Sequence, residues 1–146
     1  MDSRSDHGNV LGRCLRIRTF GVTIHDVAAI DTWLEEIATQ WSLNETVAFK
    51  ARVCIAELAA NVLEHGIAKS DDDCIVVTVD RLEDEIQVEF VDSRHAFDPT
   101  VSATTKNHAQ SNGGGAGLVL LQAYACDLTY TAEANSNRTK FKVRLS

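Results

Sequence analysis

Residues 56–66, AELAANVLEHG, place three polar side chains on a segment that is otherwise built mainly of Ala, Leu and Val. Glu57, Asn61 and His65 are four residues apart, so at about 100° per residue they share one stripe of an α-helix. Two interpretations fit this stripe. It is the solvated face of an amphipathic helix, or it presents a carboxylate, an amide and an imidazole to a cleft.

The helix that contains this stretch is expected to run from Asn44 to His65. Asn44 is a good N-cap, Glu45 complements the positive end of the helix dipole, and Gly66 stands where a left-handed C-terminal residue is wanted. Upstream, the segment His25–Trp41 repeats its apolar residues at steps of three and four. This spacing predicts a second amphipathic helix.

Alternating apolar and polar residues predict strands in the rest of the chain. Leu15, Ile17 and Thr19 alternate with Arg16 and Arg18, as in a strand with one wet face. Two hairpins follow, and Ile86, Val88 and Phe90 are expected to share one side of the first. A short buried helix is expected at 118–125. The predicted strand segments are 13–20, 74–80, 85–92, 127–133 and 138–146. This order predicts an α+β fold, a two-layer sandwich with helices packed on one face of a mainly antiparallel mixed sheet.

The composition is that of one globular domain, since the chain has 146 residues of which 45% are hydrophobic. We expect a flexible N-terminus at 1–12 and a single domain at 13–146. The net charge of -7 disfavours a nucleic-acid footprint. No apolar run approaches the roughly 20 residues that cross a bilayer, so we expect a cytoplasmic protein without membrane contact. Four scattered cysteines predict reduced thiols and no zinc site.

Asp92 ends a predicted strand, at the point where the long polar segment 93–117 begins. A segment of this length inside a compact domain is usually a lid or binding loop, or else disordered. Asp92 is either a turn former or, if it faces a pocket, an acceptor suited to the exocyclic amino group of a purine.

Four glycines, Gly113, Gly114, Gly115 and Gly117, lead directly into the last predicted helix. Glycines allow backbone N–H groups to approach an anion closely, and the helix N-terminus adds partial positive charge. A flexible hinge is the alternative. No Gly-Lys-Ser/Thr follows, so this is not a Walker A loop, and no strand precedes it as the dinucleotide-binding fingerprint requires.

The order and spacing of these three features resemble those of the GHKL, or histidine-kinase-like, ATPases, and in particular the small anti-sigma-factor serine kinases of bacterial partner switching. ELAANVLEHG resembles the N box, VDSRHAFDP the first glycine box and GGGAGLVLLQ the second. The closing NRTKFKVRL is similar to the last strand of the small kinases. The resemblance implies a Bergerat-type ATP-binding fold over nearly the whole chain.

Carried over residue by residue, the resemblance implies that Glu57 is the general base for a substrate serine and that Asn61 holds Mg²⁺ at the ATP phosphates. Asp92 would accept the adenine amino group, and the backbone of Gly115 and Gly117 would cradle the phosphates. The resemblance assigns further nucleotide contacts to the same boxes and to the ATP lid between them: His65, Phe97, Lys106, Gly113, Gly114 and Leu118.

Arg94 departs from the family pattern, because it stands where the first glycine box normally has a glycine. A left-handed backbone at this position would cost an arginine on the order of 1 to 3 kcal/mol. Its long cationic side chain would also narrow the purine pocket.

The resemblance implies an ATP-dependent protein-serine kinase and anti-sigma factor. Its substrate would be a small antagonist of the STAS type, its captured partner a sigma factor or similar regulator, and it would form a homodimer. One alternative is a partner-binding module of the same fold with weakened or lost nucleotide binding, which Arg94 favours. The other is the catalytic domain of a two-component histidine kinase; against it, only about forty residues precede the N-box helix, and they are assigned to this domain.

Overall fold

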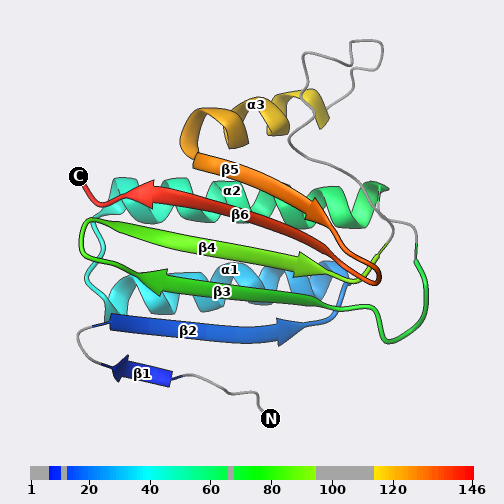
Figure 1. The fold of residues 1–146 in the computed structure, drawn as a ribbon, viewed down its shortest axis with the longest axis horizontal. Helices are drawn as coiled ribbons and strands as arrows, with labels where there is room; N and C mark the ends of the chain where they lie inside the picture. Colours follow the sequence, from blue (N-terminus) through cyan, green and yellow to red (C-terminus); the bar gives the residue numbers. More distant parts are fainter. Residues whose placement is uncertain (1–6, 11–12, 66–67, 95–113) are drawn as a thin grey trace.

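The computed structural model describes residues 7–10, 13–65, 68–94 and 114–146. They form a six-stranded sheet with helices packed on one face (Figure 1). The strands are β1 (His7–Val10), β2 (Arg13–Phe20), β3 (Ile75–Arg81), β4 (Glu85–Asp92), β5 (Cys126–Ala132) and β6 (Asn137–Arg144). The helices are α1 (Ile24–Gln40), α2 (Glu45–His65) and α3 (Gly114–Tyr124). The α+β two-layer prediction is confirmed.

The sheet has the strand order β1-β2-β3-β4-β6-β5. All five pairings described are antiparallel, although the prediction allowed for a mixed sheet. The last strand, β6, lies between β4 and β5, so its two neighbours are separated along the chain by α3 and the segment that precedes it. This insertion sets Asp92 directly opposite Asn137 in the β4–β6 register.

The two long helices begin at capping residues that the chain supplies locally. Asn44 Oδ1 accepts a hydrogen bond from the backbone N–H of Val47 at 2.9 Å, which confirms the predicted cap of α2. At the start of α1, Thr23 and Asp26 form a reciprocal capping box. Helix α1 therefore begins at Ile24, one residue before the predicted start, and α2 has the predicted bounds.

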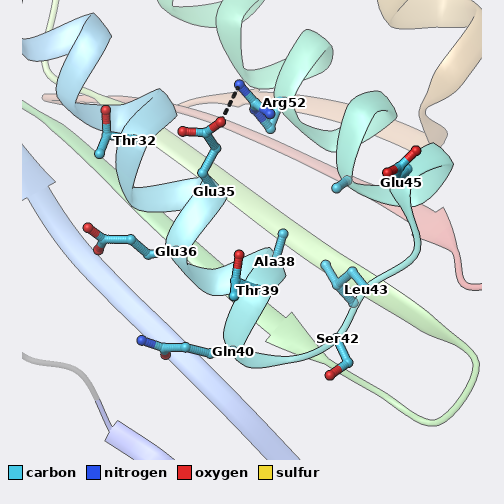
Figure 2. Close-up of a pocket in the computed structure, with 11 residues that line it drawn as sticks. Thr32, Glu35, Glu36, Ala38, Thr39, Gln40, Ser42, Leu43, Glu45 and Arg52 are labelled. Atoms are coloured by element: carbon cyan, nitrogen blue, oxygen red, sulfur yellow. Dashed lines mark ion pairs between the residues drawn. The ribbon is translucent and has the colours of Figure 1, made fainter.

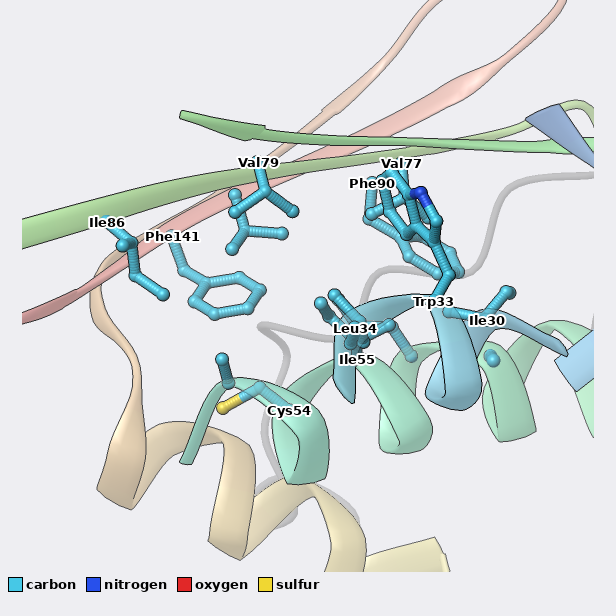
Figure 3. Close-up of a cluster of buried hydrophobic side chains, with 14 of the residues drawn as sticks. Ile30, Trp33, Leu34, Cys54, Ile55, Val77, Val79, Ile86, Phe90 and Phe141 are labelled. Carbon is cyan, nitrogen blue, oxygen red and sulfur yellow. The ribbon is translucent and has the colours of Figure 1, made fainter. Parts of the chain in front are cut away.

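The core lies between the sheet and the first two helices (Figure 3). Trp33 and Leu34 from α1 and Ile55 from α2 face side chains of the inner sheet surface, among them Val77, Val79, Ile86, Phe90 and Phe141. The predicted alternation in β4 is confirmed, because Ile86, Val88 and Phe90 are at most 2% exposed. Burying each such side chain contributes about 1.5 to 3 kcal/mol.

The side chains of β2 face the opposite sides of the sheet from those that the alternation of apolar and polar residues suggests. Arg16 and Arg18 pair with Val79 and Val77, whose side chains face the helices, so the arginines lie on the helix side of the sheet. Arg16 donates a hydrogen bond to Gln40 at the end of α1. The aliphatic parts of such arginines can cover apolar surface while the guanidinium groups contact polar or aromatic groups, here Gln40 and the ring of Phe20. Leu15 and Ile17 face the other side of the sheet.

Part of the predicted flexible N-terminus is ordered, because His7–Val10 form β1 and pair with β2. These residues do not alternate between apolar and polar side chains, so their sequence does not predict a strand. The edge of β2 supplies the hydrogen-bond partners for their backbone. The helices of the described residues include none with the length and hydropathy to cross a membrane.

Candidate functional site

Four chain segments lie toward the same end of the molecule (Figure 1): the end of β4, the start of β6, the last turns of α2 and the start of α3. Helix α3 packs against α2 and runs in the opposite direction. Its last residue, Tyr124, lies beside Phe49 near the start of α2, with ring centroids 6.0 Å apart. The glycine-rich start of α3 therefore points toward the end of α2 that carries Asn61.

The Asp92 carboxylate is only 8% exposed, at the point where β4 ends. Its Oδ1 accepts hydrogen bonds from the backbone N–H of Arg94 at 3.0 Å and from Asn137 Nδ2 at 3.1 Å. No described residue donates a hydrogen bond to Oδ2. Burial raises the pKa of Asp92, against the effect of these donors. Asp92 thus acts as a turn former through Oδ1 and has a second oxygen for a ligand.

Arg94 extends from this turn to the end of α2. Its Nε donates to Asp73 Oδ2 and its Nη1 to the backbone carbonyl of Val62, both at 3.3 Å. The main-chain N–H of Lys69 holds the pKa of Asp73 below its usual range, so an anion faces the guanidinium. Val62 is the neighbour of Asn61, and a single arginine side chain therefore connects the turn after Asp92 to the helix of Asn61.

Arg94 does not adopt the left-handed backbone that the glycine of the first glycine box could adopt. Among the described non-glycine residues, only Ser42 and Asp127 have a positive φ, so Arg94 avoids the left-handed region. The cost that a left-handed backbone would impose on an arginine therefore does not arise here. The guanidinium is bound by Asp73 and by α2, which weakens the case that Arg94 prevents nucleotide binding.

The three residues of the stripe on α2 differ in their exposure. Glu57 is half-buried, Asn61 is 6% exposed, and His65 is exposed with Glu64 as an ion-pair partner at 3.5 Å. The solvated-face interpretation is wrong for Asn61. Its Nδ2 is buried and has no hydrogen-bond partner within the described part of the chain. A buried amide without a partner is costly, and a ligand is one explanation for keeping it.

Asn61 fits the kind of magnesium site that the sequence predicts. Within the described ranges, no group of three or more His, Cys, Asp or Glu side chains is placed to hold a metal ion. Mg²⁺ in nucleotide sites commonly takes few protein ligands and completes its shell with phosphate oxygens and water. One amide oxygen on α2 is compatible with that donor set.

Helix α3 starts at Gly114, so Gly114, Gly115 and Gly117 occupy its first turn. The N–H groups of a first helical turn have no partner within the helix, and such turns are places where anions bind in proteins. Leu118 also belongs to α3. The predicted contacts Phe97, Lys106 and Gly113 lie outside the described residues.

A separate groove lies at the opposite end of α2 (Figure 2). It is bordered by the second half of α1 and the first turns of α2, and its acidic lining consists of Glu35, Glu36 and Glu45. Arg52 in this groove is paired with Asp31 at 2.7 Å and with Glu35 at 3.4 Å. Arg52 and Asn61 are about 14 Å apart along the helix axis. An acidic groove at this distance does not suit the predicted triphosphate.

Sequence reasoning missed three residues of the site: Asp73, Tyr130 and Asn137. Asn137 Nδ2 also donates to the Arg94 carbonyl at 2.6 Å, and Tyr130 Oη donates to Asn137 Oδ1. Asn137 is the first residue of the segment that resembles the family's last strand, and it falls in the connection between the predicted strands 127–133 and 138–146. That resemblance was the available signal, but only the β4–β6 register places Asn137 beside Asp92.

Comparisons with known proteins agree with this geometry. The family model described as histidine kinase-like ATPase domain matches residues 20–143. Thirteen chains of solved structures match. One is a crystal structure of the RsbU and RsbW domains of a Mycobacterium tuberculosis protein, with a TM-score of 0.66 and 17% identity over 90% of this chain and 32% of that one. At this identity the likeness shows the fold, and this chain spans about a third of that protein's length.

A comparison with curated proteins gave no significant match. The family model nevertheless extends from β2 to β6 and includes Asn61, Asp92 and the glycines at the start of α3. The chain therefore belongs to the histidine kinase-like ATPase family.

Proposed function

We propose that this chain is an ATP-dependent protein-serine kinase of the anti-sigma type. It would phosphorylate a small anti-sigma-factor antagonist of the STAS type and sequester a sigma factor or similar regulator, as a homodimer in the cytoplasm. The family supports the nucleotide. The serine substrate, the partners and the dimer rest on the resemblance of the three boxes to those of the small kinases.

One observation carries the proposal: Arg94 connects the turn after Asp92, at the end of β4, to the last turns of α2, which carry Asn61. Arg94 bonds to Asp92 through its backbone and to Val62, the neighbour of Asn61, through its side chain. Both functional side chains are buried and polar, at 8% and 6% exposure. Buried polar groups of this kind are expensive to keep unless a ligand satisfies them.

Each residue would have a distinct task. Asp92 Oδ2 would accept the purine amino group, Asn61 would hold Mg²⁺, and the N–H groups of Gly115 and Gly117 would bind phosphate oxygens. Bound MgATP supplies the phosphoryl group. Glu57, one helical turn before Asn61, would orient the serine hydroxyl and accept its proton. Phosphoryl transfer requires little beyond such positioning and charge stabilisation.

Calorimetric titration of MgATP into the wild type and Asn61→Ala tests the nucleotide site. We expect the variant to lose at least about tenfold in affinity, which corresponds to about 1.4 kcal/mol. Its free energy of unfolding should be unchanged or higher, because the substitution removes a buried NH₂ group that has no hydrogen-bond partner among the described residues. Asn135→Ala, in the exposed turn between β5 and β6, is the matched control and should change neither quantity.

The wild type must bind nucleotide at millimolar concentration for the proposal to stand. Failure of the wild type to bind would remove the kinase and leave a partner-binding module. Equal affinities of the wild type and Asn61→Ala would remove Asn61 from the magnesium site.

Glu57→Ala separates catalysis from binding. We expect MgATP affinity within about twofold of wild type and a loss of phosphoryl transfer to a co-purifying antagonist of about 10²-fold or more, as for removal of a general base. Glu36→Ala, an exposed glutamate on α1, is the control. Transfer by Glu57→Ala at the wild-type rate would exclude Glu57 as the base.

A further inference from the structure

Asn137 lies in a setting that allows its amide only one orientation. It is 4% exposed and is paired with Asp92 across β4 and β6. Its Nδ2 lies 3.1 Å from Asp92 Oδ1 and 2.6 Å from the backbone carbonyl of Arg94. An ionised carboxylate and a carbonyl can only accept hydrogen bonds. The end of the amide that faces them must therefore be the nitrogen.

The opposite end of the same amide meets a donor from the neighbouring strand. Tyr130, on β5, donates its hydroxyl proton to Asn137 Oδ1. Rotating the amide by 180° would set its oxygen against Asp92 Oδ1 and the Arg94 carbonyl, which are both acceptors, while the tyrosine hydroxyl could still accept from the NH₂ group. Little water reaches this side chain to compensate for such a mismatch. The two acceptors therefore select the orientation in which Asn137 donates to Asp92, and the hydrogen bond from Tyr130 restrains the amide in that orientation.

The direction of that donation determines how the Asp92 carboxylate is held. The Arg94 N–H and Asn137 Nδ2 both bind Oδ1, and no described residue donates to Oδ2. Two donors on one oxygen fix the rotation of the carboxylate and direct the other oxygen to a ligand. Without a fixed amide, the second of these donors is lost or reoriented.

We propose that Tyr130 is a positioning residue for purine recognition: its hydroxyl fixes the Asn137 amide, which holds Asp92 as the acceptor for a purine amino group. This inference rests on the proposed nucleotide site and adds a determinant of base specificity to it. Tyr130 acts through Asn137 and is not assigned a contact with the nucleotide.

The test compares ATP with inosine triphosphate, which carries a carbonyl oxygen in place of the purine amino group. We expect Tyr130→Phe to weaken MgATP binding about threefold to tenfold, the range of one lost hydrogen bond. Inosine triphosphate binding should stay within about twofold of wild type. Tyr124→Phe, on α3, removes the other tyrosine hydroxyl and should leave both affinities unchanged. Equal weakening of both nucleotides, or no loss for ATP, would overturn the proposal.

Asn137→Ala gives a second route if Tyr130→Phe folds poorly. It should lose the same discrimination between the two nucleotides, and the double variant should lose no more than either single variant, because both act through one hydrogen-bond chain. Additive losses would show that the two residues act independently and would contradict the proposal.

A nucleotide-free measurement separates this inference from the proposed function. The side-chain NH₂ protons of Asn137, observed by ¹⁵N NMR, should exchange with water faster in Tyr130→Phe than in wild type or Tyr124→Phe. Equal exchange rates would refute the fixing of the amide even if ATP binds. If the wild type binds neither nucleotide, the proposed function fails and the recognition role fails with it, whereas faster exchange in Tyr130→Phe would still establish the amide lock.

Discussion

Asp92 is proposed to accept the purine amino group, and its burial has a cost in folding stability. Burial raises its pKa although Asn137 and the Arg94 N–H donate to it. For a carboxyl group whose pKa is higher in the folded state, the stabilising contribution is fully present below the unfolded pKa and is lost as pH rises through the folded pKa. The ionised carboxylate therefore lowers the free energy of unfolding at neutral pH, as is common at binding sites.

Replacing Asp92 by Asn should raise the free energy of unfolding at pH 7 and abolish measurable MgATP binding. The amide oxygen can still accept from Arg94, and no buried charge remains. The gain in stability should disappear as pH falls below 3.8, the ordinary pKa of the carboxyl group, where wild-type Asp92 is protonated as well. Urea unfolding at several pH values, with the exposed Asp72→Asn as control, measures this difference. A gain that persists at pH 3 would contradict the assignment to ionised Asp92.

Helix α3 brings a glycine-rich first turn toward the end of α2 that carries Asn61 (Figure 1). Leu121 is fully buried, whereas its neighbour Leu120 is 38% exposed. The sequence predicts a helix only from Leu118, because glycine is a poor helix former. The observed start at Gly114 places the glycine N–H groups in the first turn. Burial of Leu121 anchors the helix and with it the position of that turn.

Leu121→Ala should cost about 2 to 5 kcal/mol of unfolding free energy. Leu120→Ala should cost less than about 1 kcal/mol because its side chain is already partly in water. The first variant should also weaken MgATP binding, since the start of α3 loses its anchor. If Leu121→Ala leaves too little folded protein, Leu121→Met preserves most of the volume and should cost less than about 1.5 kcal/mol. Equal costs for the two alanine variants would show that α3 is not anchored through Leu121.

In the whole molecule, β6 is the last strand in sequence but lies inside the sheet, between β4 and β5. Strand β6 pairs with both β4 and β5, and its Phe141 and Val143 are buried in the core. The fold therefore closes through contacts between residues far apart in sequence. Such closure is entropically costly and makes the sheet cooperative.

A chain that ends at Ser136 should lose cooperative thermal unfolding, because β4 and β5 lose their common partner and the core loses two large side chains. A chain that lacks only Leu145 and Ser146 keeps all of β6 and should unfold cooperatively, within about 2 kcal/mol of the full chain. Circular dichroism melts of the two truncations test this. Cooperative unfolding of the shorter chain would show that β6 is dispensable for the core.

Local signals in the sequence determined most of the elements. The apolar spacing and the Asn44 cap define α2, and alternation defines β4, because periodicity and capping depend on neighbours within a few residues. The order of the N box and the two glycine boxes along the sequence indicates the family without any knowledge of their contacts. Strand β1 has no such local signal, and its backbone partners come from β2.

Tertiary structure alone decided how the site is assembled. Asp92 and Asn137 are 45 residues apart, and Arg94 and Val62 are 32 apart, so their hydrogen bonds depend on strand register and on the packing of α2 against the sheet. The same register puts Arg16 on the helix side of β2 and sets Tyr130 beside Asn137. The sequence by itself determined the order and spacing of the boxes and with them the family, because residue types and spacing are local properties. Only the folded chain decided that Arg94 binds Asp73 and α2, and that Tyr130 orients Asn137, because long-range pairing fixes the direction of each side chain.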